Sequence, residues 1–223
     1  MKRIISLPIL FLLQLTTVSL YAANIDRQAF DPNDGFALIS SEEELRLSWE
    51  FAGREAFIDF QFIPRQGNTP AAPLIKSLGI DSSTIMEGLD PNYLFWVGDR
   101  DLELRDGWEV FCDRVPTRPY SVEKGYRVPG EVTVSTREGR ATVEIDGLNS
   151  ENFSGSLAFI FYRDSPFIHM EARVSTERPA TAFLYHVGLA KPETQGQNLE
   201  WIDAFDTPRI EPISNSTASV YQP

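Results

Sequence analysis

Three side chains capable of acid–base or ion-pair chemistry stand at alternate positions near the C-terminal end of this 223-residue chain. They are His169, Glu171 and Arg173, and they alternate with the apolar residues Ile168, Met170, Ala172 and Val174. A period of two predicts a β-strand with one core face and one polar face. A base beside a guanidinium suits proton abstraction next to a uronate carboxyl group. The alternative is a solvated outer face carrying cross-strand charge pairs.

Tyr185 and His186, on the next predicted strand, are the remaining candidates for catalytic side chains. The alternative for His186 is a core histidine whose ring is satisfied by hydrogen bonds. The chain has only two histidines, and it lacks HExxH, paired-cysteine, GxSxG, GxGxxG and P-loop motifs. A three-histidine zinc site is therefore excluded, nucleotide and serine-hydrolase chemistry are disfavoured, and no metal site is predicted.

One acidic run offers oxygen ligands of the kind that calcium prefers, at Asp99, Asp101, Glu103 and Asp106. Its spacing departs from an EF-hand loop, because Leu104 stands where glycine is needed and Val110 stands at the twelfth position. We therefore expect no cofactor, with calcium at these four residues as the alternative. The competing interpretation is a short strand at 102–104 with solvated acids.

Aromatic and arginine side chains gather around a long Pro- and Gly-rich segment, Val115–Gly130. Flat aromatic rings stack on the apolar face of a pyranose, and guanidinium groups bind acidic sugars. The candidate ligand-binding residues are Trp96, Trp108, Arg118, Tyr120 and Arg127. The alternative is that the aromatic side chains are core packing beneath a loop.

The N-terminus has the pattern of a secretory signal peptide, with Lys2 and Arg3 before an apolar run that ends in small residues. We assign residues 1–23 to it, with a retained N-terminal anchor as the alternative, and no later segment is apolar enough to span a membrane. Its removal takes the net charge from −12 to −14, which disfavours nucleic acid and anionic lipid as partners. The single cysteine, Cys112, excludes an intramolecular disulfide. A bacterial protein that is secreted, periplasmic or held in the cell envelope fits these features.

Composition and periodicity predict an all-β domain, an antiparallel β-sandwich spanning residues 24–210. One or two short helices are expected between Ala72 and Gly88, with Asp81 or Ser82 as a cap. Residues 211–223 are expected to be an irregular tail, either a linker or the edge of a truncation. The expected strands include 35–40, 45–51, 56–63, 93–98, 131–136, 140–145, 157–162, 167–174, 181–189 and 199–205.

The stretch Gly130–Leu189 resembles the galactose-mutarotase-like supersandwich of secreted polysaccharide lyases and glycoside hydrolases. The resemblance rests on a meander of alternating strands followed by Phe161–Ile168, Glu171–Val174 and Ala182–Tyr185. It covers about a quarter of the chain, implies a supersandwich-like fold and a carbohydrate-related role, and supplies no catalytic residues.

Two functional hypotheses remain. The first is an exported domain that binds or processes a polysaccharide or oligosaccharide, and an enzyme of this kind would be a polysaccharide lyase or a glycoside hydrolase. Hydrolysis by two carboxylates stays open because their separation is not visible in a sequence. The second is a non-enzymatic envelope or surface protein with a structural or adhesive role.

Overall fold

In a computed structural model the chain is described at residues 23–63, 71–100, 119–128, 130–190 and 198–212. These residues form strands joined by short turns and a single 3₁₀ turn, η1 (Pro32–Asp34). The strands are β1 (Asn24–Asp26), β2 (Phe36–Ser40), β3 (Glu44–Phe51), β4 (Arg54–Gln61), β5 (Ile75–Ile80), β6 (Ser83–Asp99), β7 (Tyr120–Lys124), β8 (Tyr126–Arg127), β9 (Glu131–Arg137), β10 (Arg140–Asn149), β11 (Ser154–Tyr162), β12 (Ile168–Ser175), β13 (Thr181–Ala190), β14 (Asn198–Ile202) and β15 (Pro208–Pro212).

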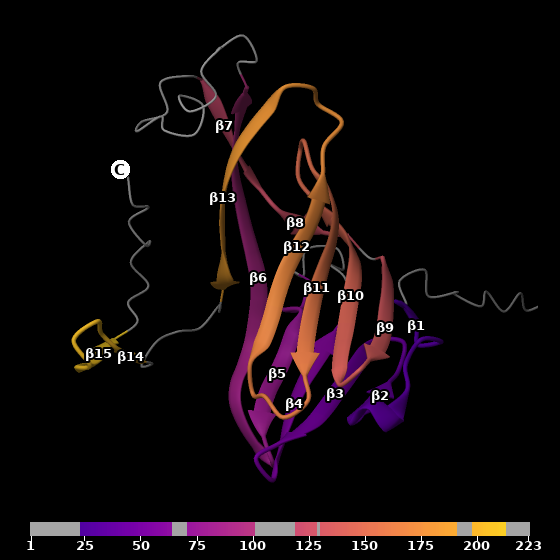
Figure 1. Ribbon diagram of the computed structural model, residues 1–223. Helices are drawn as coiled ribbons and strands as arrows, with labels where there is room; N and C mark the ends of the chain where they lie inside the picture. The colour runs from indigo at the N-terminus through magenta and orange to yellow at the C-terminus, as the bar shows by residue number, and fades with distance from the viewer. Residues whose placement is uncertain (1–22, 64–70, 101–118, 129, 191–197, 213–223) are drawn as a thin grey trace, which may run out of the picture.

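Two sheets pack face to face, as Figure 1 shows. The six-stranded sheet has the order β1-β9-β10-β11-β12, with β8 also paired to β10. The seven-stranded sheet has the order β13-β6-β5-β4-β3-β2, with β7 also paired to β6. Pairing is antiparallel except between β1 and β9. The strands β14 and β15 form a separate hairpin. The predicted all-β antiparallel sandwich is therefore confirmed.

The core lies between the sheets and consists of the inward-facing residues of alternating strands. Aromatic rings from the two layers meet there: Phe60 lies 4.9 Å from Phe159, and Trp49 lies 5.1 Å from Phe161, between ring centroids. The indole Nε1 of Trp49 also donates a hydrogen bond to the carbonyl oxygen of Ser165 at 2.7 Å. Burying such rings removes 150–250 Å² each from water and stabilises the sandwich.

The prediction of one or two helices between Ala72 and Gly88 is wrong, because this segment forms β5, a tight turn and the start of β6. Asp81 has a φ of 56°, and its carboxylate accepts a hydrogen bond from the backbone N–H of Glu55 at 3.1 Å. This bond and the Arg54 ion pair hold the pKa of Asp81 below its usual range. Asp81 therefore closes a strand turn instead of capping a helix, and pairing with β4 overrides local propensity.

Part of the Pro- and Gly-rich segment Val115–Gly130, which the sequence analysis treats as a loop, is strand. β7 pairs with β6 of one sheet, and β8 pairs with β10 of the other. Between them the N–H of Gly125 donates to the carbonyl oxygen of Tyr93 at 2.8 Å. A Cβ atom at Gly125 would lie 3.1 Å from that of Tyr93, so glycine permits this close crossing between the layers.

Most of the other segments that the sequence predicts as strands are strands in the structure. The hairpins β3–β4 and β9–β10 and the meander β10–β11–β12 form as predicted. The last expected strand, 199–205, corresponds to β14, which ends at Ile202 and turns back into β15. No helix in the described ranges is long and apolar enough to cross a bilayer.

Candidate functional site

The second half of strand β6 is the middle strand of a three-stranded ribbon, β7-β6-β13. The first half of β6 pairs with β5, whereas its second half, Asp90–Asp99, pairs with β13 on one side and β7 on the other. Odd-numbered residues of this half, Tyr93, Phe95 and Val97, are buried in the core. Even-numbered residues therefore lie on the outer face of the ribbon.

We call that outer surface the ribbon face. It consists of Asn92, Leu94, Trp96 and Gly98 of β6 and their cross-strand partners Tyr120, Val122, Lys124, Ala182, Leu184, His186 and Gly188. Directly paired residues of antiparallel strands share a face, so the ladder register alone places these side chains together. From Asn92 to Gly98 the face is about 20 Å long at ~3.3 Å per residue.

The upper end of the ribbon face is aromatic and apolar. Trp96 lies between Val122 and Leu184 in register, and both of these neighbours are exposed. The next row holds Tyr120, also exposed, opposite Gly98. A Cβ atom on Gly98 would lie 3.8 Å from that of Tyr120. The structure thus brings together two of the predicted ligand-binding residues, Trp96 and Tyr120.

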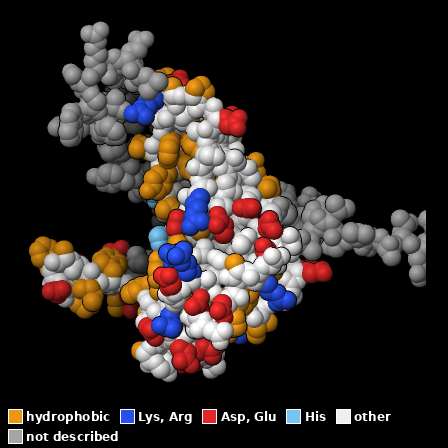
Figure 2. Space-filling model, turned by 45° about the vertical axis from the view of Figure 1, so that its right-hand side comes forward, with side chains coloured by type: hydrophobic (Ala, Val, Ile, Leu, Met, Phe, Trp, Pro, Cys, Tyr) orange, Lys and Arg blue, Asp and Glu red, His pale blue; other side chains and the backbone are white. Residues whose placement is uncertain are grey.

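On the face of the molecule that Figure 2 shows, a group of hydrophobic side chains lies in the upper part, and most of the charged side chains lie below it. The upper part is where Figure 1 places β13, β7 and the end of β6.

The lower end of the ribbon face is polar. Lys124 and His186 flank Leu94 from the two sides, and Asn92 lies opposite Gly188. A Cβ atom on Gly188 would meet nothing within 4 Å, so the surface is open above this row. Small residues on β13 at Ala182 and Gly188 therefore leave the face shallow.

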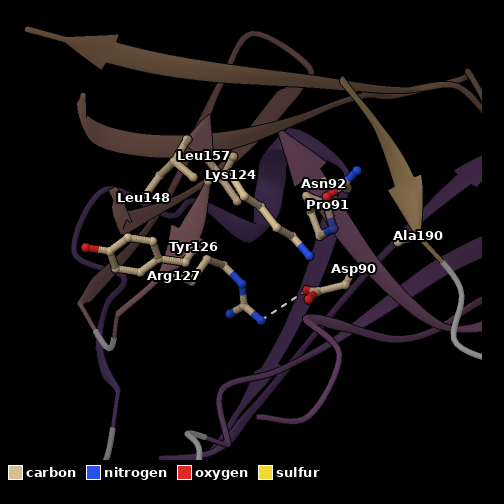
Figure 3. Close-up of a pocket in the computed structure, with 10 residues that line it drawn as sticks. Asp90, Pro91, Asn92, Lys124, Tyr126, Arg127, Leu148, Leu157 and Ala190 are labelled. Atoms are coloured by element: carbon tan, nitrogen blue, oxygen red, sulfur yellow. Dashed lines mark hydrogen bonds and ion pairs between the residues drawn. The ribbon is translucent and has the colours of Figure 1, made fainter. Parts of the chain in front are cut away.

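The polar end runs into a hollow with a volume of about 90 Å³, drawn in Figure 3. Asp90, Asn92 and Lys124 line it, together with Tyr126 and Arg127 from β8. Nη2 of Arg127 lies 3.1 Å from Oδ1 of Asp90, and the same oxygen accepts the backbone N–H of Leu74 at 3.1 Å. Pockets for drug-sized ligands measure ~300–1,000 Å³, so this hollow suits one polar group of a ligand that lies across the surface.

A buried carboxylate holds β7 and the crossover in place. Glu123 is 5% exposed and accepts hydrogen bonds from Ser150 Oγ at 2.8 Å, from the backbone N–H of Asn152 at 3.0 Å, and from the Asn152 side chain. Ser121 Oγ lies at 3.4 Å. Burial alone would raise the pKa of Glu123, but these hydrogen bonds outweigh it and hold that pKa below its usual range. β7 is thereby fixed to the turn between β10 and β11.

The candidates His169, Glu171 and Arg173 all lie on the outer face of β12, while Ile168, Met170, Ala172 and Val174 pack against the core. Arg173 contacts Glu144 at 2.9 Å and Glu171 at 3.3 Å. The hydrogen bond from Arg173 lowers the pKa of Glu171, and the Glu171 carboxylate in turn raises that of Arg173. The guanidinium of Arg173 thus contacts two carboxylates, that of Glu171 on the same strand and that of Glu144 on β10, on the far side of β11.

The two groups of predicted catalytic side chains lie on different sheets. His169, Glu171 and Arg173 belong to β12, whereas Tyr185 and His186 belong to β13. Tyr185 pairs with buried Phe95 and is directed toward the inner side, and His186 pairs with Leu94 on the ribbon face. The structure therefore does not gather all five side chains into one cluster.

Several predicted residues lie outside the described part of the chain, namely Trp108 and Arg118 of the binding set and Asp101, Glu103 and Asp106 of the calcium set. Asp99 is described, and its carboxylate forms an ion pair with Arg178. In the described ranges no three or more His, Cys, Asp or Glu side chains are grouped as a metal would require.

Sequence reasoning did not identify Asn92, Lys124, Leu184, Gly188 or Asp90 as parts of a site. The alternation of β6 was visible in the sequence, but the partners of its outward residues depend on pairings with β7 and β13 across more than twenty residues of chain. A strand prediction at 120–124 would have supplied the missing signal, since Tyr120 and Val122 alternate with the inward Ser121 and Glu123.

No family model matches this chain, and searches of curated proteins and of solved structures give no match either.

Proposed function

We propose that this protein is an exported β-sandwich module that binds a polysaccharide along the ribbon face. The observation that carries the proposal is the arrangement of that face, in which Trp96 and Tyr120 share a surface with Lys124 and His186 and lead to Arg127. Tyr120 is exposed and Trp96 is partly exposed, and the accessible parts of such rings supply stacking surfaces for pyranose rings. Planar and cationic donors at the other end suit hydroxyl and carboxylate groups.

The shape of the face supports an extended ligand. It is shallow, about 20 Å long at ~3.3 Å per residue, and ends in a hollow large enough for one polar group. A guanidinium has five N–H donors, and Asp90 orients that of Arg127. The signal-peptide pattern at residues 1–23 supports export to the place where polysaccharides occur.

The arrangement of the ribbon face supports binding of a polysaccharide better than it supports catalysis on one. Lyase chemistry needs a base and a charge-neutralising group on the same sugar. Lys124 and His186 lie on opposite sides of Leu94, each one strand spacing of ~5 Å away, so their backbones are ~10 Å apart. A structural or adhesive role remains the second candidate, and the exposed apolar character of β13 favours it.

The test is affinity electrophoresis through gels that contain neutral or uronate-rich polysaccharides. We expect retardation on at least one gel, lost in Gly188→Trp because the indole fills open space over the face without a backbone clash. Ala37→Trp, at an exposed position on β2, is the matched control and should be retarded like the wild type. A folded wild-type protein that is retarded on no gel rejects the proposal, and retention by Gly188→Trp rejects the location.

A further inference from the structure

Strand β13 is an edge strand that is not protected against further pairing. It hydrogen-bonds to β6 over its whole length, Thr181–Ala190, and it is the terminal strand in the order of its sheet. In the described ranges no strand pairs with its other edge, which is also its position in Figure 1. Its ten residues carry a row of backbone N–H and C=O groups along that edge.

The side chains of β13 are apolar on both faces. Leu184 is 62% exposed on the ribbon face, and Tyr185 is 66% exposed on the inner side, where Phe183, Val187 and Leu189 are also exposed. A strand with one solvated face alternates apolar and polar residues, whereas a strand apolar on both faces is typical of one enclosed by neighbours. The composition of β13 is therefore that of a covered strand.

The usual devices that block edge-to-edge association are missing from β13. The strand contains no Asp, Glu, Lys, Arg or Pro, and its register with β6 has no bulge. The other sheet edges differ: β1 has three residues, β2 has five, and β12 presents Glu171 and Arg173. Among the edges of the described sheets, β13 alone is long, uncharged and regular.

We propose that the free edge of β13 pairs with the β13 edge of a second copy of this chain. Two copies with a net charge of −12 each repel one another, so association needs a contact surface that lacks acidic groups. β13 supplies such a surface and is complementary to itself, since antiparallel pairing about a two-fold axis places the same residues on both sides.

The apolar side chains of β13 add to the contact that the backbone edge offers. The five exposed apolar side chains of β13 together expose on the order of 500 Å² per molecule, taking ~200 Å² for each large side chain. Two copies bring ~1,000 Å² of exposed apolar surface to the new edge, and pairing buries the part of it that lies beside the neighbouring strand, in addition to the backbone groups that form the new ladder.

The two-fold axis runs perpendicular to the sheet, so the outer faces of both copies lie on the same side. Paired residues share a face, and the axis therefore passes through a residue pair near the strand's midpoint. An axis through Tyr185 brings Phe183 opposite Val187 and Leu184 opposite His186. The two seven-stranded sheets then join into one continuous sheet, in which the two three-stranded ribbons are neighbours and the two ribbon faces lie side by side.

Sedimentation velocity of the purified chain over a range of concentrations, without glycan, tests this inference. We expect a concentration-dependent dimer in the wild type that is lost in Tyr185→Lys and in Leu184→Lys. The charge at position 185 lies directly opposite its symmetry mate, and the charge at position 184 lies opposite His186 of the second copy and diagonally across from its own mate. Ile39→Lys is the matched control: Ile39 is 71% exposed on the β2 edge strand, and its variant should still dimerise. Urea unfolding confirms that the variants fold.

A crosslink tests the register. In a Cys112→Ser background, Tyr185→Cys should form a disulfide-linked dimer on mild oxidation, because directly opposed Cα atoms of antiparallel strands lie ~4.5–5.5 Å apart. Ile39→Cys should not form one. A wild type that stays monomeric at its highest soluble concentration overturns the inference, and so does a dimer that survives in both lysine variants. Tyr185 lies away from the ribbon face, so Tyr185→Lys should keep glycan binding, which separates the two proposals.

Discussion

Replacing Glu123 by glutamine should destabilise the fold by an amount that the hydrogen bonds around this carboxylate predict. Its two oxygens accept from four donors contributed by Ser121, Ser150 and Asn152. In Glu123→Gln one oxygen becomes an NH₂ group, which faces two of those donors. Hydrogen bonds to a charged acceptor contribute about 1.5–3 kcal/mol each, and serine hydroxyls reorient in part, so we expect a loss of about 2–4 kcal/mol.

The assay is urea unfolding at neutral pH, with Glu43→Gln, an exposed glutamate, as the control. With a urea dependence of ~2 kcal/mol/M, the midpoint of Glu123→Gln should fall by roughly 1–2 M, whereas that of the control should not change. Equal midpoints for Glu123→Gln and the wild type would show that this carboxylate does not fix β7 to the β10–β11 turn.

The same pair of proteins should respond differently to acid. The pKa of Glu123 is lower in the folded state than in the unfolded state, so its ionised form favours folding above the unfolded pKa. That contribution is lost as the pH falls through the folded pKa. The stability gap between wild type and Glu123→Gln should therefore be constant from pH 6 to 8 and narrow below about pH 4. A gap that is independent of pH would contradict this reasoning.

Three further changes test the packing. Phe159→Ala removes a buried ring that contacts Phe60 and should cost about 3–5 kcal/mol in urea unfolding. Gly155→Ala should destabilise strongly, because its Cβ would overlap the Arg173 carbonyl oxygen, whereas Gly188→Ala should change the unfolding free energy by less than about 0.5 kcal/mol. Arg173→Ala, on an exposed face, should cost no more than about 1 kcal/mol, and a larger loss would contradict the solvated character of its ion pairs.

Local alternation was enough to predict most strands of the sandwich, with β5, β7, β8 and the first half of β6 among the exceptions. β12 shows why: its apolar residues pack against the core and its polar residues face outward, as a period of two requires. The same signal identified β3, β4 and the β9–β10 hairpin. The prediction of helices at 72–88 failed because a short apolar segment does not distinguish helix from strand. The pairing of β5 with β4 on one side and with β6 on the other makes this segment a strand.

The candidate site was less accessible to sequence reasoning because it depends on register. Trp96 and Tyr120 were identified by residue type, but their common face follows from pairing between β6 and β7. Arg127 was identified as a cation, whereas its contact with Asp90 requires the crossover at Gly125. Gly188 has no functional group by which sequence reasoning could have identified it. Its role in the proposed site comes from the open space that the fold leaves above it.

The most direct test of the proposed ribbon face is a binding titration of Trp96→Ala against fragments of whichever polysaccharide retards the wild type. Trp201→Ala, on the β14–β15 hairpin and 37% exposed, is the control for loss of an exposed tryptophan. We expect the dissociation constant to rise at least ~tenfold for Trp96→Ala, which corresponds to about 1.4 kcal/mol, and to stay unchanged for Trp201→Ala. Equal affinities of Trp96→Ala and the wild type would contradict a glycan site on this face.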